Sequence, residues 1–455
     1  MDEFVGAYGD KRRAAAISRL YGGIVEQTSL VIRKVGVDRG GELSAHRALS
    51  SPHVTPRETL RCLTRGTAVA AAGRRIVAAQ DTTEVNFPGR QSRGLGPAGQ
   101  RNARVADETP GFLIHATIAV DADADAVLGL LDAEIWTRQR QAPTERRQRE
   151  LADKESRRWL TAARTAAERL ADAAQCIVVG DRESDIYALF SRRPASVELL
   201  VRAAQNRALD DGTLLFAATA QWPVLGRHVV KVPPRGPGTC AREAEVVLRA
   251  GTVVLRHPRN ARREGDPDRI TISLVEAIET DPPEGQPPLH WRLLTTLPAQ
   301  TEAEAAEIVR LYRLRWRIEQ TFRMLKTHGL QIEDVQTAEP HRLFNLAALA
   351  VAAAVRIIQL VDARDGSSRP ASDVATDQQI AAGRALCAKL QGRTERQRNP
   401  HTAGSLAWIS WIVARLGGWN CYYKPPGPKT MRDGWLRFAA IAEGFTLAAQ
   451  GSHDV

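Results

Sequence analysis

The sequence has 455 residues, more than one compact core usually holds, which predicts two or three domains. Apolar residues make up 43% and charged residues 25%, a balance typical of a globular protein rather than a disordered chain. The net charge of +11 favours an acidic partner, and nucleic acid is the first candidate.

Two further classes are disfavoured. The five cysteines lie far apart without a C-x-x-C pair, which argues against a zinc site or a disulfide framework. The longest apolar run, Leu346 to Val355, is shorter than the ~18–20 residues that span a bilayer. No apolar signal core appears in the first residues. We therefore expect a cytoplasmic protein that does not enter a membrane.

Residues 1–65 are predicted to form short helices. The segment GDKRRAAAISRLYGGIVEQ places apolar residues at helical spacing beside Lys11, Arg12 and Arg13. A second short helix is expected in SAHRALSSPHVT. This part of the chain is interpreted as a small basic helical domain.

From about residue 74 the pattern changes to an α/β order. Strands are predicted in RRIVAAQDTTEVNF and GFLIHATIAV, with DADAD closing a hairpin to a third strand. A helical region from Thr144 to about Ala174 follows, then the buried strand CIVVG, the helix DIYALFSRR and the strand VELLVRAA. A mixed sheet in this order fits the ribonuclease-H-like fold.

The second half begins with an antiparallel β insertion, predicted at about 206–300 from the short runs AEVVLRA, GTVVLRH, RITISLVEAI and WRLLTTL. Helices are expected at 302–327 and 341–362, and residues 362–373 have the composition of a linker. The remainder, 363–455, is predicted to be a helical domain. The catalytic domain then spans 66–362.

One carboxylate stands out in the basic segment LYRLRWRIEQTFRMLK. Tyr312, Arg315, Glu319 and Lys326 are spaced i, i+3, i+7 and i+14, which places them within roughly 60° on one helical face. Glu319 is open to two interpretations. It can form an ordinary ion pair with Arg315 or Arg323, or bind a metal ion beside phosphate-binding groups.

Two aspartates favour the second interpretation. Asp81 lies in a predicted strand, and Asp181 directly follows the buried run Ile177-Val178-Val179. A carboxylate at a strand end of an α/β sheet is well placed for chemistry in a cleft. Asp185, four residues further on, is the alternative to Asp181. We prefer Asp181 because it directly follows the strand.

These motifs together resemble bacterial cut-and-paste transposases of the insertion-sequence-four family. The spacing Tyr312-x2-Arg315-x3-Glu319-x6-Lys326 is similar to the Y-R-E-K signature of that family. QDTTEVNF and VVGDRESDIYA resemble its two aspartate segments. GDKRR and GELSAHRALSSPHV resemble its N-terminal DNA-binding region, LHWRLLTT its strand at the end of the β insertion, and SLAWISWIVARLGGW its C-terminal region.

The resemblance implies a site. Asp81, Asp181 and Glu319 would be a D-D-E triad that binds two Mg²⁺ ions, with Mn²⁺ as a substitute. Family members cut transposon ends through a DNA hairpin, which requires a flipped base. Trp291 in LHWRLLTT matches the tryptophan that stacks on this base, although a core tryptophan is the alternative. Tyr312, Arg315, Lys326 and, with a one-residue gap in the match, Arg202 correspond to residues that hold phosphates near the hairpin.

The resemblance also implies partners and leaves alternatives open. The expected partners are double-stranded DNA, as terminal inverted repeats and target, and a second copy of the chain, with residues 363–455 mediating dimerisation and residues 1–65, including Lys11, Arg12 and Arg13, recognising the ends. The expected location is the bacterial cytoplasm, at the nucleoid. A catalytically idle DNA-binding copy and a nuclease of the same fold are the alternatives.

Overall fold

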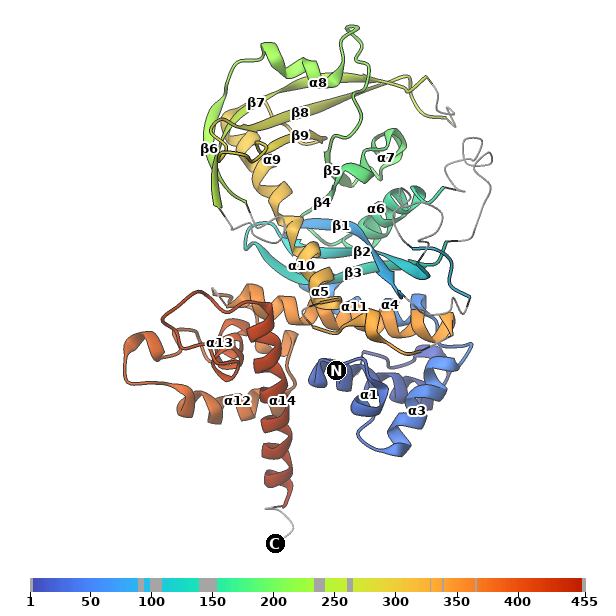
Figure 1. The fold of residues 1–455 in the computed structure, drawn as a ribbon, viewed down its shortest axis with the longest axis vertical. Coiled ribbons are helices and arrows are strands. Elements are labelled where there is room, and N and C mark those ends of the chain that lie inside the picture. The colour runs from blue at the N-terminus through green and yellow to red at the C-terminus, as the bar shows by residue number, and fades with distance from the viewer. Residues whose placement is uncertain are drawn as a thin grey trace. The chain divides into compact units, whose positions relative to one another are not determined.

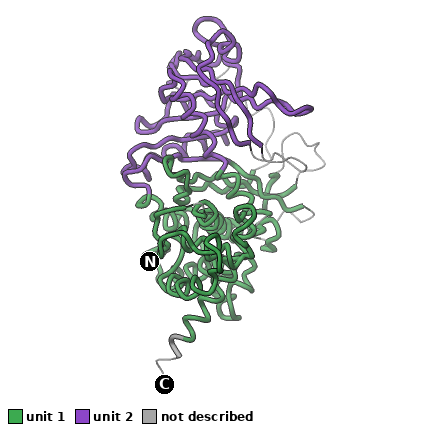
Figure 2. The backbone as a smooth tube through the Cα atoms, turned by 90° about the vertical axis from the view of Figure 1, so that its left-hand side faces the viewer, with its two compact units in different colours: residues 1–70, 82–140, 317–455 green, residues 71–81, 141–316 purple. Residues whose placement is uncertain are grey.

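The computed structural model describes residues 3–88, 94–98, 109–138, 154–232, 242–259, 265–327, 329–337, 339–364 and 366–451. The chain divides into two compact units (Figure 2). The first contains residues 1–70, 82–140 and 317–455, and the second contains residues 71–81 and 141–316. The chain passes from one unit to the other after residues 70, 81, 140 and 316.

The N-terminal part of the first unit is helical, as the sequence predicts. Asp10 starts the first long helix by accepting a hydrogen bond from the backbone N–H of Arg12 at 2.7 Å. Pro56 occupies the first turn of a later helix, behind the N-cap residue Thr55. The elements are η1 (Ala7–Gly9), α1 (Lys11–Gln27), α2 (Ile32–Val35), α3 (Arg39–Ser50), α4 (Pro56–Leu63) and α5 (Arg65–Ala71).

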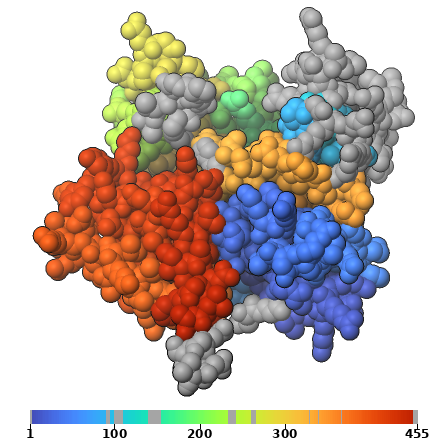
Figure 3. Space-filling view, turned by 60° about the horizontal axis from the view of Figure 1, so that its bottom comes forward, coloured from blue at the N-terminus to red at the C-terminus, as the bar shows by residue number. Residues whose placement is uncertain are grey.

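These N-terminal helices share a core with the C-terminal part of the same unit. The indole N–H of Trp435 donates to the carbonyl of Val25 at 2.8 Å, and the amide of Asn345 donates to the carbonyls of Leu49 and Val54. Figure 3 shows the blue N-terminal helices beside the red C-terminal segment. Burial against the C-terminal helices therefore contributes to the stability of residues 1–65.

The central helix of the first unit is α11 (Pro340–Ala363), which packs against the strand β3 (Ala126–Trp136) and α4 (Figure 1). It is longer than the apolar run seen in the sequence, and its length and mean hydropathy of 2.0 would suffice to cross a membrane. However, 89% of the apolar window is buried inside the protein. Gln359, on its buried side, donates to the carbonyl of Leu128 at 2.6 Å. These are the properties of a core helix.

The C-terminal elements follow α11. The predicted linker 362–373 is anchored rather than loose, because Arg369 donates to the carbonyl of Val127 at 2.7 Å and pairs with Asp373 at 2.6 Å. Its composition suggested a linker, but the arginine binds it to the hairpin of the same unit. The elements are η8 (Ala371–Asp373), α12 (Asp377–Leu390), η9 (Glu395–Gln397), α13 (Leu406–Leu416) and α14 (Pro428–Gly451).

One nine-stranded sheet has the order β3-β2-β1-β4-β5-β9-β8-β7-β6. β2 (Gly111–Asp121) and β3 form the predicted antiparallel hairpin, closed at the DADAD turn. β1 (Arg75–Asn86) is parallel to β4 (Gln175–Gly180), and β4 is parallel to β5 (Val197–Arg202). The mixed α/β class is confirmed.

The predicted order of strands and helices is also confirmed, with narrower helices. α6 (Arg157–Arg169) lies between β3 and β4, while the earlier part of the predicted helix 144–174 falls largely outside the described residues. The 3-10 turn η5 (Arg182–Ser184) and α7 (Tyr187–Arg192) lie between β4 and β5.

The β insertion extends the sheet of the second unit with antiparallel strands. Two of its predicted runs, AEVVLRA and GTVVLRH, are one strand, so that prediction is wrong. Gly251 lies inside this strand, where a Cβ would come within 3.1 Å of the ring of Trp222. The elements are α8 (Leu215–Ala218), η6 (Thr219–Gln221), β6 (Gly226–Val232), β7 (Arg242–Arg256), β8 (Arg269–Glu279) and β9 (His290–Thr295).

Candidate active site

The two predicted aspartates lie side by side in the second unit. β1 and β4 pair in parallel with Ala79 opposite Val179, so the same register continued by two residues places Asp81 opposite Asp181. Adjacent strands are about 4.8 Å apart, and residues at the same level project from the same face. Both carboxylates therefore project together from the point where the buried part of each strand ends.

Asp181 is fixed by the tight turn that follows β4. Its Oδ1 accepts a hydrogen bond from the backbone N–H of Glu183 at 2.9 Å, and its carbonyl accepts one from the hydroxyl of buried Ser184 at 2.6 Å. Gly180 permits this approach, because a Cβ there would lie 2.3 Å from the Ser184 hydroxyl and 3.4 Å from the Trp159 ring. The sequence Gly180-Asp181 thus holds the carboxylate at the sheet edge.

Asp185, the alternative to Asp181, is committed to a structural role. Its side chain is completely buried and pairs with Arg207 at 2.6 Å. Its other oxygen accepts hydrogen bonds from the backbone N–H groups of Ala204 and Gln205, at 2.7 and 2.8 Å. Asp185 therefore ties the end of the β4–η5 turn to the segment after β5.

Arg202 stands at the same level as Asp181 on the next strand. β4 and β5 pair with Gly180 opposite Val201, so the next residues in register are Asp181 and Arg202. The guanidinium of Arg202 donates to the carbonyl of His290 at 3.1 Å. Three neighbouring parallel strands therefore present two carboxylates and an arginine along one edge.

The helix α9 (Glu302–Leu314) supplies the next part of the site. It begins in a capping box between Thr301 and Glu304. The sequence predicts one helix over 302–327, but the structure divides it at Arg315 into α9 and α10 (Trp316–Leu325). Arg315 itself is only 7% exposed, and its Nη1 donates to Oδ2 of Asp81 at 2.8 Å.

Tyr312 connects the aspartates with Trp291. Its ring is buried and meets Trp291 edge-on, with 5.3 Å between the ring centroids. Burial raises the pKa of the Tyr312 hydroxyl, and the charge of Asp181 raises it further, while Arg315 and Arg202 oppose the shift. Those electrostatic interactions place Tyr312 near both predicted arginines and Asp181.

Trp291 is 3% exposed, so the ring packs in the protein interior as the alternative interpretation of this residue expected. It faces Tyr312, and a base can stack on it only after the surrounding side chains move. The structure thus brings six of the predicted residues together in the second unit: Asp81, Asp181, Arg202, Trp291, Tyr312 and Arg315.

Glu319 and Lys326 belong to the first unit. Both lie on or directly after α10, and Glu319 follows Arg315 by one helical turn. Lys326 donates to the carbonyl of Glu84 and lies 3.4 Å from Glu333. Among the residues that the structure describes, no group of three or more His, Cys, Asp or Glu side chains is arranged to hold a metal ion. Of the predicted triad, Asp81 and Asp181 belong to the second unit and Glu319 to the first.

The predicted basic residues of the N-terminal helices differ in accessibility. Lys11 and Arg12 are exposed in the first turn of α1. Arg13 is half-buried and donates to the carbonyl of Tyr8 at 2.9 Å, which attaches η1 to α1. Lys11 and Arg12 are therefore better placed than Arg13 for contact with DNA phosphates.

Sequence reasoning did not identify the partners that hold this site. Arg207 lies 22 residues after Asp185, and no periodic pattern joins the two. Arg317 pairs with Asp362 of α11 at 3.1 Å and donates to the carbonyl of Asp125. Such long-range pairs carry no local sequence signal.

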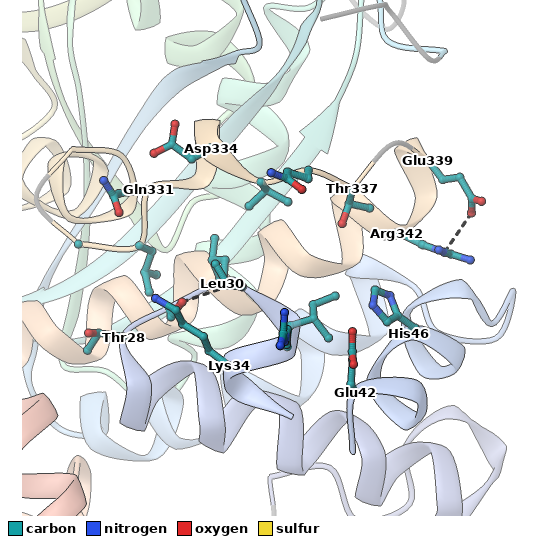
Figure 4. Close-up of a pocket in the computed structure, with 18 residues that line it drawn as sticks. Thr28, Leu30, Lys34, Glu42, His46, Gln331, Asp334, Thr337, Glu339 and Arg342 are labelled. Carbon is teal, nitrogen blue, oxygen red and sulfur yellow. Dashed lines mark hydrogen bonds and ion pairs between the residues drawn. The ribbon is translucent and has the colours of Figure 1, made fainter. Parts of the chain in front are cut away.

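A cavity of about 560 Å³ lies in the first unit (Figure 4). It is lined by residues of α2, α3 and the segment leading into α11, and none of the predicted site residues contributes to it. Its wall mixes charges: Lys34 and Glu42 lie on one side, and Arg342, 3.1 Å from Glu339, on the other. This cavity has no charge preference that would select a phosphate.

Comparison with known families matched part of the chain. Residues 133–356 match the sequence model of the transposase DDE domain family. The matched segment contains Asp181, Glu319 and the Tyr312–Arg315 pair, while Asp81 precedes it. The DDE domain is ribonuclease-H-like, in agreement with the mixed α/β sheet. The match supports a DDE transposase, a class of enzymes that generally uses divalent metal ions and acts on DNA.

Proposed function

We propose that the protein is a DNA transposase that moves an insertion sequence by a cut-and-paste route, as members of the insertion-sequence-four family do. The observation that carries the proposal is the β1–β4 register, which pairs Ala79 with Val179 two residues before Asp81 and Asp181, together with Arg315 held on Asp81 at 2.8 Å. The family match over residues 133–356 supports the same class.

The donor set suits magnesium. Two carboxylates about 5 Å apart repel each other and provide hard oxygen ligands, which is the chemistry that Mg²⁺ prefers. We assign Asp81, Asp181 and Glu319 as the residues that hold two Mg²⁺ ions, with Mn²⁺ as a substitute. When bound, such ions activate the attacking oxygen and stabilise the leaving oxygen of a phosphodiester.

The proposed reaction begins at each transposon end. A water oxygen attacks the scissile phosphorus, and the 3′ oxygen leaves with the bonding electrons and takes a proton. The new 3′-hydroxyl then attacks the opposite DNA strand, which forms a hairpin and releases the flanking DNA. Hydrolysis reopens the hairpin, and the 3′-hydroxyl attacks a phosphodiester of the target DNA.

The protein's own residues orient the DNA in this scheme. Arg315, Arg202 and Lys326 bind backbone phosphates, which fixes the position of the DNA strand without reading its sequence. Tyr312 packs between the two arginines, and Trp291 receives the flipped base once its ring is uncovered. Residues 1–65 recognise the terminal inverted repeats, and residues 363–455 join two copies of the chain in the DNA complex. The protein acts in the cytoplasm, on nucleoid DNA.

The experiment is incubation of the purified protein with the DNA ends that flank its reading frame, with and without Mg²⁺. Nicks, hairpins and joined products that require Mg²⁺ are expected, and Asp81→Asn, Asp181→Asn and Glu319→Gln should each remove them while DNA binding persists. Two outcomes contradict the proposal. Nicking without hairpins or joining indicates a nuclease of this fold, and binding without any cleavage indicates an idle DNA-binding protein.

A further inference from the structure

A basic pocket lies beside Asp181 in the second unit. It has a volume of about 240 Å³. Its charged lining residues are Arg182, Arg202 and Arg292, with His290 beside them. None of its seven described lining residues is acidic. The charge of the lining therefore favours an anion.

The arginines of this pocket are directed by a buried carboxylate. Glu276 of β8 is 5% exposed and stands opposite Arg292 in the pairing with β9. It accepts a hydrogen bond from Nε2 of His290 at 2.8 Å, and its oxygens lie 3.3 Å from Arg292 and 3.6 Å from Arg249. Burial raises the pKa of Glu276, but hydrogen bonds from His290 and Thr219 and the charges of His290 and Arg292 outweigh it and lower the pKa. Glu276 therefore stays ionised and holds His290 and Arg292 at the pocket wall.

Aromatic packing and exposure complete the geometry. The guanidinium of Arg292 lies over the ring of Phe216, 4.6 Å from its centroid, which restricts it to one plane. Arg182 is exposed and has no ion-pair partner among the described residues. His290 and Arg292 flank Trp291 on β9, so their side chains project from the opposite face of that strand.

We propose that this pocket binds a backbone phosphate of the DNA strand next to the phosphate that reacts at Asp181. The assignment rests on the proposed function, and it adds Arg182 and Arg292 as phosphate-binding residues and Glu276 as a positioning residue. Arg182 directly follows Asp181, and Arg202 stands level with it, so a phosphate in the pocket belongs to a nucleotide beside the reacting one. One DNA strand thus passes the sheet edge with successive phosphates held at Asp181 and in the pocket.

The test compares DNA binding by full-length variants, measured by fluorescence anisotropy with labelled 20-nucleotide single-stranded and duplex DNA over a range of salt. Arg182→Ala and Arg292→Ala should each weaken binding about tenfold and reduce the salt slope by roughly 0.7–0.9, the value of one phosphate contact. The matched control is Arg227→Ala on β6, an exposed arginine three strands away from β9, which should change affinity less than twofold.

Glu276→Gln provides the sharper comparison. Removing an acid raises the net positive charge, which by long-range electrostatics should strengthen DNA binding. The pocket predicts the opposite, about three- to tenfold weaker binding, because His290 and Arg292 lose their anchor. Glu245→Gln, which removes an exposed acid of β7, is the control and should leave binding unchanged or slightly tighter. A melting curve for each variant confirms that the fold is retained, and Arg182→Ala tests the pocket even if Glu276→Gln unfolds.

The proposal is wrong if Arg182→Ala and Arg227→Ala bind DNA equally well, or if Glu276→Gln binds DNA more tightly than the unaltered protein. Inorganic phosphate at matched ionic strength tests the source of the anion: if Arg182→Ala and Arg292→Ala change only its binding and not that of DNA, the assignment to a DNA strand is wrong. Mg²⁺-dependent cleavage by the unaltered protein is scored separately. If the unaltered protein cleaves DNA but the pocket variants bind DNA normally, the pocket proposal alone is wrong. If the variants bind DNA more weakly but the unaltered protein does not cleave it, the pocket proposal stands and the transposase proposal is wrong.

Discussion

Asp185→Ala and Asp181→Ala should have opposite effects, although the two residues are one turn apart. Asp185 is fully buried and holds Arg207, which is itself 7% exposed on its side chain, together with two backbone N–H groups. Removing one partner of a buried ion pair leaves the other charge uncompensated and costs about 3–5 kcal/mol. At roughly 2 °C per kcal/mol for a protein larger than 200 residues, the melting temperature should fall by about 5–10 °C. Cleavage measured below the new melting temperature should continue.

Asp181→Ala should behave differently. Its carboxylate is half-exposed and makes one turn hydrogen bond with Glu183, worth about 1 kcal/mol, and its loss also relieves repulsion from Asp81. Stability should stay within about 1 kcal/mol while Mg²⁺-dependent cleavage is lost. Thermal unfolding and gel-based cleavage of both variants provide the measurement, and a double variant Asp185→Ala/Arg207→Met should recover part of the lost stability. If Asp185→Ala is folded and inactive while Asp181→Ala cuts DNA, the assignment of the second aspartate is wrong.

Three further predictions concern other parts of the molecule. Trp291→Ala should lower the melting temperature, because the ring is buried against Tyr312. Below that temperature it should reduce hairpin formation roughly 10–100-fold relative to nicking, because ~1–3 kcal/mol of base stacking is lost. Equal loss of both products on a gel would make Trp291 purely structural. The double variant Lys11→Ala/Arg12→Ala should bind the transposon ends more weakly, and the slope of log affinity against log salt concentration should fall by up to about 2 without a change in the melting curve. An unchanged slope would contradict a DNA contact at α1. Because folding lowers the pKa of Glu276, the ionised carboxylate stabilises the fold above its ordinary pKa of 4.5, and this contribution is lost as the pH falls below that value. Glu276→Gln should therefore flatten the decline of the melting temperature between about pH 5 and pH 3. Parallel curves for the variant and the unaltered protein would rule out this linkage.

Much of the site could be predicted because its signals are local. Asp181 follows a continuous β-branched run, and a carboxylate after such a run marks the end of a buried strand. Periodicity alone places Arg315 on the same helical face as Tyr312, and its guanidinium lies 5.9 Å from the centroid of that ring. However, periodicity cannot show that the helix divides at Arg315, or that its guanidinium pairs with Asp81, 234 residues earlier in the chain. Residue spacing predicts which side chains share a helical face, but it does not predict which distant residue that face contacts.

The errors have a common cause in tertiary context. Gly251 stands between two runs predicted as separate, yet it lies inside one long strand beside the ring of Trp222. Residues 362–373 have a linker composition, yet Arg369 attaches them to the hairpin. Asp185 has the same local appearance as Asp181, and only the buried Arg207 separates a structural carboxylate from a candidate metal ligand. In each case the deciding group lies far away in sequence.

The electrostatics of the second unit explain why one edge of the sheet can carry two adjacent carboxylates. At the roughly 5 Å that separates neighbouring strands, and at an effective dielectric constant near 20, two carboxylates repel each other by roughly 3 kcal/mol. Arg315, bonded to Asp81 at 2.8 Å, offsets such repulsion, and Arg202 stands level with Asp181 on the next strand. The arginine that the proposed function assigns to a DNA phosphate therefore also stabilises the folded carboxylate pair.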